Sequence, residues 1–365
     1  MEIACRINDS NFSRNSFLHN CFQNCKLFHK QKISINMSFL FSSYLKGLST
    51  LPQISVGTHD GVFHCDEVFA FALLQDALKS TCSNSTIQLI RTRDKDMLST
   101  CHILLDVGGE YSLETGRFDH HQDRTITKSS FGLLYDALML MCPLDDMSEP
   151  FFSQFVAGID IMDVNPTSVT PVSHEGVRSL NQIISGFNRI EEGSSVQLEQ
   201  FFKAVSFAAE VLKNEFVSAQ QKGKAEIEYL NREILDNNVA LFINFSPIWK
   251  EKGNHQFAIM PYTVPGQWQL VSADTTITVV PETVKVIEGF IFRHNSGFMA
   301  TFNSLEAAKK AIILLPKRYK HVSLFGESNF FNTRDECVKD AENMFYYQDV
   351  AANTQYERVY QIVEG

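Results

Sequence analysis

Long apolar runs and closely spaced cysteine pairs are both missing from this sequence. No stretch of 18 or more apolar residues is present, which argues against a transmembrane helix, and we expect a soluble chain with no membrane partner. No CxxC pair occurs, and "CFQNC" (Cys21 and Cys25) is half a zinc motif without a second half. The eight cysteines are scattered along the chain, at positions 5, 21, 25, 65, 82, 101, 142 and 337. This distribution indicates free thiols in a reducing compartment.

Basic residues are also scarce. The chain has 32 Lys and Arg against 42 Asp and Glu, a formal net charge of −10. Binding of a polyanion would therefore need a local basic groove or bridging metal ions. With 365 residues, 44% of them hydrophobic, the chain can bury a substantial core, and its length favours about two domains.

Residues 1–50 form a leader that differs from the rest of the chain. They hold six Lys or Arg but only two acids, Glu2 and Asp9, together with many Ser and Asn. Scarce acids and abundant serines are typical of a mitochondrial presequence. The low Arg content and modest amphipathicity fit a disordered leader, with Met37 as an alternative start, equally well.

Strands and helices alternate from residue 54 onward. Three apolar runs predict strands, at 54–59 ("ISVGTH"), 87–93 ("IQLIRTR") and 102–109 ("HILLDVGG"). Apolar residues at helical spacing predict helices over 66–80, 130–142, 150–162 and 173–188. This alternation predicts an α/β domain with a mostly parallel sheet over 51–190, whose ligands gather beyond the C-terminal ends of its strands.

The pattern changes after residue 190. Residues 191–238 predict a long helical connector with charges on its outer face. Residues 239–315 contain four apolar runs and one helix, which predicts a smaller α+β domain. The last segment, 316–365, is interpreted as an added helix and tail.

Polar side chains that could carry chemistry follow three successive strands of the first domain. A carboxylate that ends an apolar strand, as Asp106 does, is costly to bury unless it is paired or bound to metal. Imidazoles and carboxylates without thiolates suit Mn²⁺, Fe²⁺, Co²⁺ or Zn²⁺, and there are enough here for two ions about 4 Å apart, bridged by Asp106. The candidates are His59, His64, Asp66, Asp106, Asp119, His120 and His121, with Asp160 and Asp163 on or after a helix.

Simpler interpretations apply to several polar residues. Cys65 points away from both neighbours at strand-like spacing and is interpreted as structural. Arg91 and Arg93 could bind a phosphate oxygen, but a structural ion-pair network with Asp94 or Asp96 is slightly favoured. The remaining histidines are interpreted as surface residues: His102, His174, His255 and His321.

Four motifs together resemble a known family. "VGTHDGVFHCDE", "RTRD" with "DVGGEY", and "RFDHHQ", in this order, are similar to the melanocyte proliferating gene family of exonucleases, a branch of the DHH-type phosphoesterase superfamily. The resemblance runs from about 54 to 188. It continues more weakly through "PIWKE" (247–251) and "GQWQL" (266–270) to "HNSGF" (294–298).

The resemblance implies a metal-dependent phosphodiesterase that trims RNA or short oligonucleotides from the 3′ end, in mitochondria, the nucleus or the cytoplasm. It implies two Mn²⁺-like ions. One would be held by His59, His64 and Asp106, and the other by Asp66, Asp106, His120 and Asp160. His121 would face the scissile phosphate, and Asp119 would support the histidines.

The resemblance also places substrate contacts in the second domain. A matching segment of the superfamily grips substrate across an interdomain cleft, and its counterparts here are Arg293, His294, Ser296 and Gly297. The chain departs from the family pattern at Ala157, Ile161, Met162, Met299 and Ala300, and at Phe131, where a small residue is usual. These departures do not change the expected metal ligands; they affect the expected identity of the substrate.

Three functions remain open from the sequence. The first is a two-metal RNA exonuclease, and the second is a phosphohydrolase for pyrophosphate or a nucleotide, which the net acidity favours mildly. The third is a metal-binding regulatory protein with little catalysis. A fold and a site seldom specify the substrate, and the sequence is also compatible with a homo-oligomer.

Overall fold

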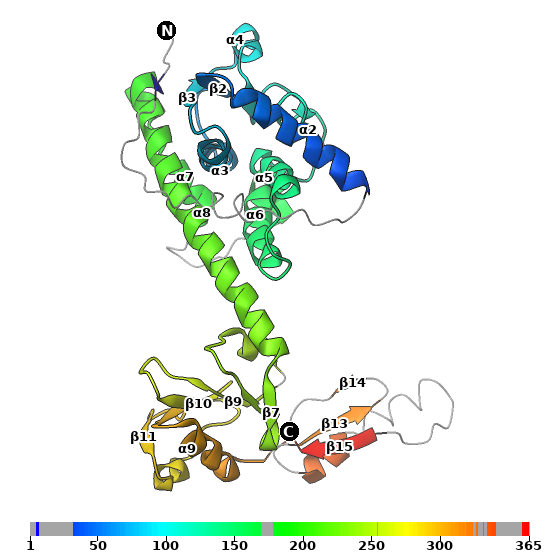
Figure 1. Cartoon of the computed structure of the whole chain (residues 1–365), viewed down its shortest axis with the longest axis vertical. Coiled ribbons are helices and arrows are strands. Elements are labelled where there is room, and N and C mark those ends of the chain that lie inside the picture. Colours follow the sequence, from blue (N-terminus) through cyan, green and yellow to red (C-terminus); the bar gives the residue numbers. More distant parts are fainter. Residues whose placement is uncertain are drawn as a thin grey trace, which may run out of the picture. The chain divides into compact units, whose positions relative to one another are not determined.

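The structure, a computed structural model, describes residues 5–6, 32–168, 178–253, 255–317, 319–323, 326–327, 331, 334–340 and 360–364. The chain divides into two compact units, Met1–Gly223 and Lys224–Gly365. The division lies within helix α8 (Ser194–Leu230), which Figure 1 shows as one continuous helix of 37 residues. None of the described helices combines the length and the hydropathy needed to cross a bilayer.

A six-stranded, mostly parallel sheet organises the first unit. Its strands in spatial order are β1 (Cys5–Arg6), β3 (Thr86–Arg91), β2 (Gln53–Thr58), β4 (Ile103–Leu105), β6 (Arg117–Phe118) and β5 (Tyr111–Ser112). The four inner strands are parallel, and both edge strands are antiparallel. The predicted α/β fold class is confirmed.

Side-chain alternation gives this sheet two different faces. Ile103 and Leu105 point into the main core, whereas Leu104 between them packs on the opposite face with Leu98 and Cys101. The short helix α4 (Lys95–Ser99) supplies Leu98. The main core is shared with α2 (Lys32–Leu48), α3 (Cys65–Thr81), α5 (Ser130–Met141), α6 (Glu149–Val164), α7 (Leu180–Ser185) and the first part of α8.

Helix α2 lies within the predicted leader, and its later residues pack into the folded unit; that residues 1–50 form a presequence or a disordered leader stays a prediction. Phe41, Leu45 and Leu48 recur at helical spacing and are buried in the main core. The Tyr44 hydroxyl donates a hydrogen bond to the carbonyl of His102. Burial is described for α2 only from residue 40 onward, and Cys21 and Cys25 lie outside the described residues.

The predicted helices of the first unit are present, with one difference. Over 173–188, the structure describes helix only at Leu180–Ser185, and residues 173–177 lie outside the described part. Cysteines 65, 82, 101 and 337 are buried free thiols, and Cys142 is also buried. Short 3-10 turns occur at Pro166–Ser168, Ile190–Glu192, Asp236–Asn238, Ile248–Lys250, Glu282–Val286 and Ala311–Leu314.

The second unit is built on a mostly antiparallel sheet. Its order is β11 (Phe290–Arg293), β12 (Met299–Phe302), β10 (Trp268–Ser272), β9 (Phe257–Pro261), β8 (Val239–Leu241) and β7 (Glu233–Leu235). Helix α9 (Leu305–Lys310) adds Ala307 and Ala308 to a core with Ile259, Leu270 and Phe302. This is the smaller α+β fold that the sequence predicts.

The C-terminal segment contains more strand than its prediction as a helix and tail. A three-stranded antiparallel sheet is formed by β14 (Gly326–Glu327), β13 (Tyr319–Ser323) and β15 (Tyr360–Glu364). Residues 334–340 are helical. β15 has only five residues, and sequence periodicity alone does not distinguish so short a strand from an irregular tail.

Candidate metal centre

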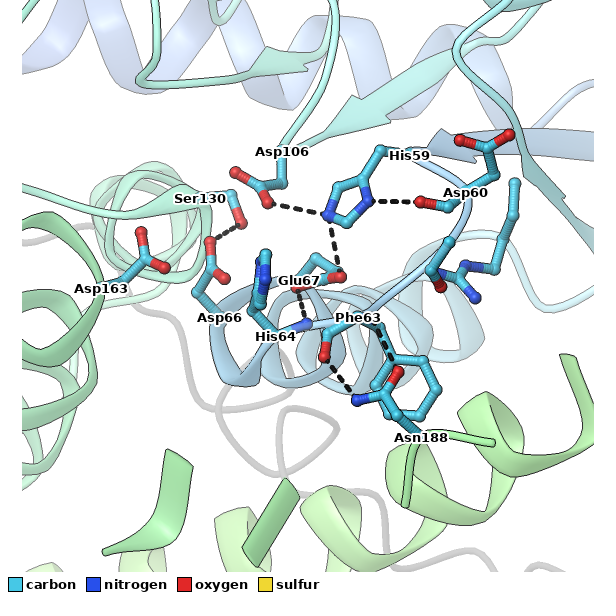
Figure 2. Close-up of polar contacts among 12 residues, drawn as sticks. His59, Asp60, Phe63, His64, Asp66, Glu67, Asp106, Ser130, Asp163 and Asn188 are labelled. Carbon is cyan, nitrogen blue, oxygen red and sulfur yellow. Dashed lines mark hydrogen bonds and ion pairs between the residues drawn. The ribbon is translucent and has the colours of Figure 1, made fainter. Parts of the chain in front are cut away.

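Imidazoles and carboxylates converge at the C-terminal edge of the parallel sheet. Strands β2, β4 and β6 are neighbours, so the residues that follow them meet at one edge. The first turn of α3 and the last turn of α6 add further carboxylates. Figure 2 shows His59, Asp106 and Glu67 turned toward one another, with Asp66 and Asp163 beside them.

Asp106 lies at the centre of this arrangement. Its Oδ2 is 3.3 Å from Nε2 of His59, and its Oδ1 is 3.2 Å from Nε2 of His120. The side chain is buried, and its backbone has φ +57°, a left-handed conformation that is unusual for a residue with a Cβ. Strained backbone of this kind collects at functional sites, where surrounding structure holds it.

One group of ligand atoms comes from His59, His64, Glu67 and Asp106, which lie within 4.8 Å of one another. Nδ1 of His59 lies 2.9 Å from the carbonyl of Asp60 and can donate to it. In the tautomer that donates there, the lone pair of Nε2 faces the cluster, as is usual for a histidine that binds metal. Nη2 of Arg93, 3.2 Å from the same Nδ1, would donate to it in the other tautomer. Nε2 also lies 3.0 Å from Oε1 of Glu67.

Two further groups complete the cluster. Asp106, His120 and His121 form one, and His64, Asp66 and Asp163 form the other. Nε2 of His120 lies 3.1 Å from Oδ2 of Asp163. Oδ2 of Asp66 accepts a hydrogen bond of 2.8 Å from Ser130, which leaves Oδ1 facing the cluster's other acids.

The donor set fits a divalent cation. Oδ1 of Asp66, Oε1 of Glu67 and Oδ1 of Asp106 are buried and accept no hydrogen bond within the described part of the chain. Two ligand atoms about 2.1 Å from one ion, at a right angle to each other, lie about 3 Å apart. The nitrogen–oxygen separations of 3.0 to 3.3 Å match this spacing.

Electrostatics at the cluster favour bound positive charge. Burial lowers the pKa of His59 and His120, but close contacts with carboxylates, Asp106 first, outweigh it and raise both to about 10. Burial raises the pKa of Asp106, and its histidine partners outweigh that effect and hold it at about 2. Burial and then repulsion from Asp106 and Asp163 raise the pKa of Asp66 well above its usual value.

Asp119 and His121 form a separate pair at the rim. Oδ1 of Asp119 accepts from Nδ1 (2.7 Å) and the backbone N–H (3.1 Å) of His121, and Oδ2 accepts from Gly109 N (2.6 Å). The carboxylate is therefore occupied by hydrogen bonds. The His121 side chain remains 63% exposed, so Nε2 is accessible to a substrate.

Asp160, the residue chosen from the sequence as a ligand, lies apart from these groups. Its Oδ1 accepts from the backbone N–H (3.0 Å) and the hydroxyl (2.6 Å) of Ser129, at the start of α5. A Cβ at Gly132 would lie 2.2 Å from its Oδ2, so α5 approaches it closely. The structure brings Asp163, one helical turn later on α6, to His120 instead.

Arg91 and Arg93 have different surroundings. The Arg91 guanidinium lies 5.4 Å from the ring centroid of Phe63 and 4.7 Å from that of Phe201, and Nη2 donates to the Gly61 carbonyl (3.2 Å). Arg93 is exposed and forms an ion pair with Asp60 at 3.3 Å. Asp94 instead accepts from Met97 N and caps α4, so the acids expected to pair with these arginines are not their partners.

The predicted substrate residues of the second unit begin at the last residue of β11, Arg293. Nε of Arg293 donates to the Val280 carbonyl (2.7 Å), and Nη1 lies 3.0 Å from Glu282, so this guanidinium already has protein partners. His294 and Ser296 are exposed, with Nδ1 and Oγ 2.8 Å apart. Gly297 has φ +74°, and a Cβ there would lie 2.7 Å from Nη2 of Arg293.

Two histidines interpreted as surface residues are not on the surface. His255 is buried, with Nε2 2.6 Å from Nε of Arg232 and Nδ1 3.0 Å from the Asn238 carbonyl. His102 is half-buried, and its Nδ1 accepts from the backbone N–H of Ser55 (3.0 Å). The side chains of His174 and His321 lie outside the described residues.

Glu67 is a member of the site that sequence reasoning missed. It is fully buried, and its Oε2 accepts from the backbone N–H of His64 (2.8 Å), the N-cap residue of α3. A polar N-cap followed three residues later by Glu is a capping-box pattern, which was legible in "HCDE". That pattern explains the hydrogen bond accepted by Oε2, but it does not predict that Oε1 faces His59.

Comparisons with known proteins identify the family of this chain. Residues 55–241 match the family model MYG1_exonuc, described as "Uncharacterised protein family (UPF0160)". The chain is 31% identical to "MYG1 protein" of Chlamydia muridarum over 297 residues, which cover 72% of this chain and 97% of that protein. It is 47% identical to "MYG1 exonuclease" of Mus musculus over 78 residues, 21% of this chain and 19% of that protein. The resemblance inferred from the motifs is confirmed, and the chain belongs to the MYG1 family.

Proposed function

We propose that this chain is a metal-dependent nuclease, a 3′-to-5′ exonuclease acting on RNA. The observation that carries the proposal is the set of buried carboxylate oxygens without hydrogen bonds, which face imidazole nitrogens at the edge of the sheet. The printed name of the mouse relative, an exonuclease, supports nucleic acid as the substrate class. RNA, the 3′ end and Mn²⁺ come from the motif resemblance.

Two ions fit the groups of ligands. His59, His64, Glu67 and Asp106, the first group, would hold one ion. The other ion would be held by residues taken from the two further groups, Asp66, Asp106, His120 and Asp163, with Asp106 shared. Asp163 replaces Asp160 in the set expected from the motifs. Two such cations, when bound, lower the pKa of a water molecule and stabilise charge on the scissile phosphate.

The protein's own side chains would orient the substrate. Asp119 holds Nδ1 of His121, which leaves the exposed Nε2 to contact the substrate. Asp66, Glu67 and Asp106 are buried, whereas His64 and His121 of the same cluster are exposed and could meet the substrate. In the second unit, His294 and Ser296 are the exposed candidates for a contact with RNA.

The test is hydrolysis by the purified full chain with Mn²⁺. Substrates are 5′-end-labelled RNA, pyrophosphate and linear dinucleotides. Stepwise shortening of the RNA from its 3′ end is expected, and His120→Ala should abolish it while the protein stays folded. Phosphate release from pyrophosphate alone would indicate a small-molecule phosphohydrolase, and no turnover despite bound Mn²⁺ would indicate a regulatory metal-binding protein.

We also propose a mitochondrial or nuclear location, from the resemblance and the acid-poor N-terminal residues. Imaging the chain with a C-terminal fluorescent tag tests this. The full chain should be compared with a chain that begins at Met37, which retains the buried part of α2. Mitochondrial signal that is lost only from the shorter chain would assign the targeting role to residues 1–36.

A further inference from the structure

Residues 60–63 connect two ligands of the first group, His59 and His64. They lie outside helices and strands, and none of the backbone–backbone hydrogen bonds described for turns and loops involves them. Their conformation is therefore determined by side chains from elsewhere. We propose that Asn188, with Gln197 behind it, is a positioning residue that holds this loop so that His59 and His64 reach the same ion. This inference rests on the metal centre proposed above.

Asn188 pairs with the loop backbone through both atoms of its amide. Oδ1 accepts from Phe63 N, and Nδ2 donates to the Phe63 carbonyl, each at 3.0 Å. Figure 2 shows the amide beside Phe63, directly before His64. The arrangement imitates a strand partner, although 125 residues separate the two positions. It holds the residue before a ligand at a defined place.

Gln197, in the first turn of α8, connects Asn188 to the other end of the loop. Nε2 donates to Oδ1 of Asn188 (2.5 Å) and to the Gly61 carbonyl (3.0 Å). Oε1 accepts from Arg189 N at 2.6 Å. Gln197 is only 5% exposed, and a buried amide with each atom paired has little freedom to rotate.

Apolar packing holds the same loop from α8. The Phe63 ring is fully buried and meets the Phe201 ring edge-on, with centroids 5.3 Å apart. Gly61 has φ +78°, and a larger residue would be strained there. A loop fixed at Gly61 and Phe63 leaves little freedom to the histidines that flank it. Residues that orient metal ligands in this way typically change metal affinity by roughly 10- to 100-fold when substituted.

The test is a titration of the full chain with Mn²⁺ alone, in which binding is measured by calorimetry and by electron paramagnetic resonance. In Asn188→Ala, one of two Mn²⁺ affinities should fall roughly 10- to 100-fold. The other should be retained, because Asp66, Asp106, His120 and Asp163 lie outside the loop. Asn188→Asp keeps the acceptor for Phe63 N and Gln197, so its loss should be smaller.

Asn181→Asp on α7 is the matched control. The side chain of Asn181 is half-buried and makes no hydrogen bond with any residue that the structure describes, so both affinities should be unchanged. Unchanged Mn²⁺ binding in both Asn188 variants would overturn the inference. So would an equal fall in both affinities together with the melting temperature, which would indicate loss of the fold. Absence of Mn²⁺ binding in the wild type would instead contradict the proposed function.

Discussion

Oδ2 of Asp163 lies 3.1 Å from Nε2 of His120, and this contact joins α6 to the segment that follows β6. Asp160 is on the same helix, one turn earlier, but accepts hydrogen bonds from Ser129. Two carboxylates three residues apart therefore have separate tasks. One faces the candidate metal centre, and the other attaches α6 to the start of α5.

We expect Asp163→Asn to remove most metal-dependent activity. The substitution keeps the shape of the side chain but removes the charge beside His120, and a direct ligand should matter more than the roughly 10- to 100-fold typical of outer residues. Without metal, the variant should be as stable as the wild type or more so, because repulsion with Asp66 is relieved. Mn²⁺ titration and metal-free thermal unfolding measure the two effects. Unaltered Mn²⁺ affinity would remove Asp163 from the ligand set.

Asp160→Ala should lower stability and leave metal binding unchanged. Two donors of Ser129 lose their buried acceptor, which costs about 1–3 kcal/mol in the free energy of unfolding. Asp160→Asn retains the Oδ1 acceptor and removes a charge whose pKa burial raises, so it should be tolerated. Urea unfolding of both variants compares them, with Mn²⁺ affinity as the second measurement. If Asp160→Asn loses an ion while remaining folded, the original ligand assignment is restored.

Glu67→Gln separates two roles of one side chain. An amide retains an acceptor for His64 N, so a pure capping role predicts almost no change. A metal-facing role of Oε1 predicts weaker Mn²⁺ binding, because the charge 3.0 Å from His59 is removed. We expect the second result. Glu114→Gln, on an exposed turn between β5 and β6, is the matched control and should bind Mn²⁺ as the wild type does.

Metal should stabilise the first unit against heat. At a Mn²⁺ concentration 100 times its dissociation constant, each site contributes about 2.7 kcal/mol. For a unit of this size, that is a rise of roughly 5 to 11 °C in the melting temperature. A thermal shift experiment with Mn²⁺, and then with excess EDTA, measures it. The rise should be reversed by EDTA and reduced in Asp163→Asn, and an equal rise in that variant would point to a site elsewhere.

The edge of the sheet was predictable because strand ends are visible in the sequence. His59, Asp106 and His120 each follow an apolar run, and parallel strands bring their C-terminal ends together. The alternation of strands and helices does not show which residue in the last turn of a helix faces the site. Asp160 and Asp163 are three residues apart and fit the same helical face, so only the packing of α6 against α5 distinguishes them.

Other residues were missed because their partners are far away in the chain. Asn188 and Phe63 are 125 residues apart, and no local pattern connects an amide to a backbone at that distance. His255 looks like any loop histidine until Arg232 is placed 2.6 Å from its Nε2. Residues 1–50 were interpreted as a leader from their composition, and the helical spacing of Phe41, Leu45 and Leu48 in α2 was not considered.

His102 should make the stability of the first unit depend on pH. Its pKa is lowered, first by burial and then by the Arg117 charge, and neutral Nδ1 accepts from Ser55 N. The unfolded state, with a pKa near 6.5, then binds the proton more readily, so this stabilisation is present above pH 6.5 and is lost as the pH falls. His102→Asn places an amide oxygen close to the position of Nδ1 and should flatten the dependence. Metal-free urea unfolding between pH 7.5 and 5.5 compares the two proteins, and parallel curves would show that His102 does not titrate as expected.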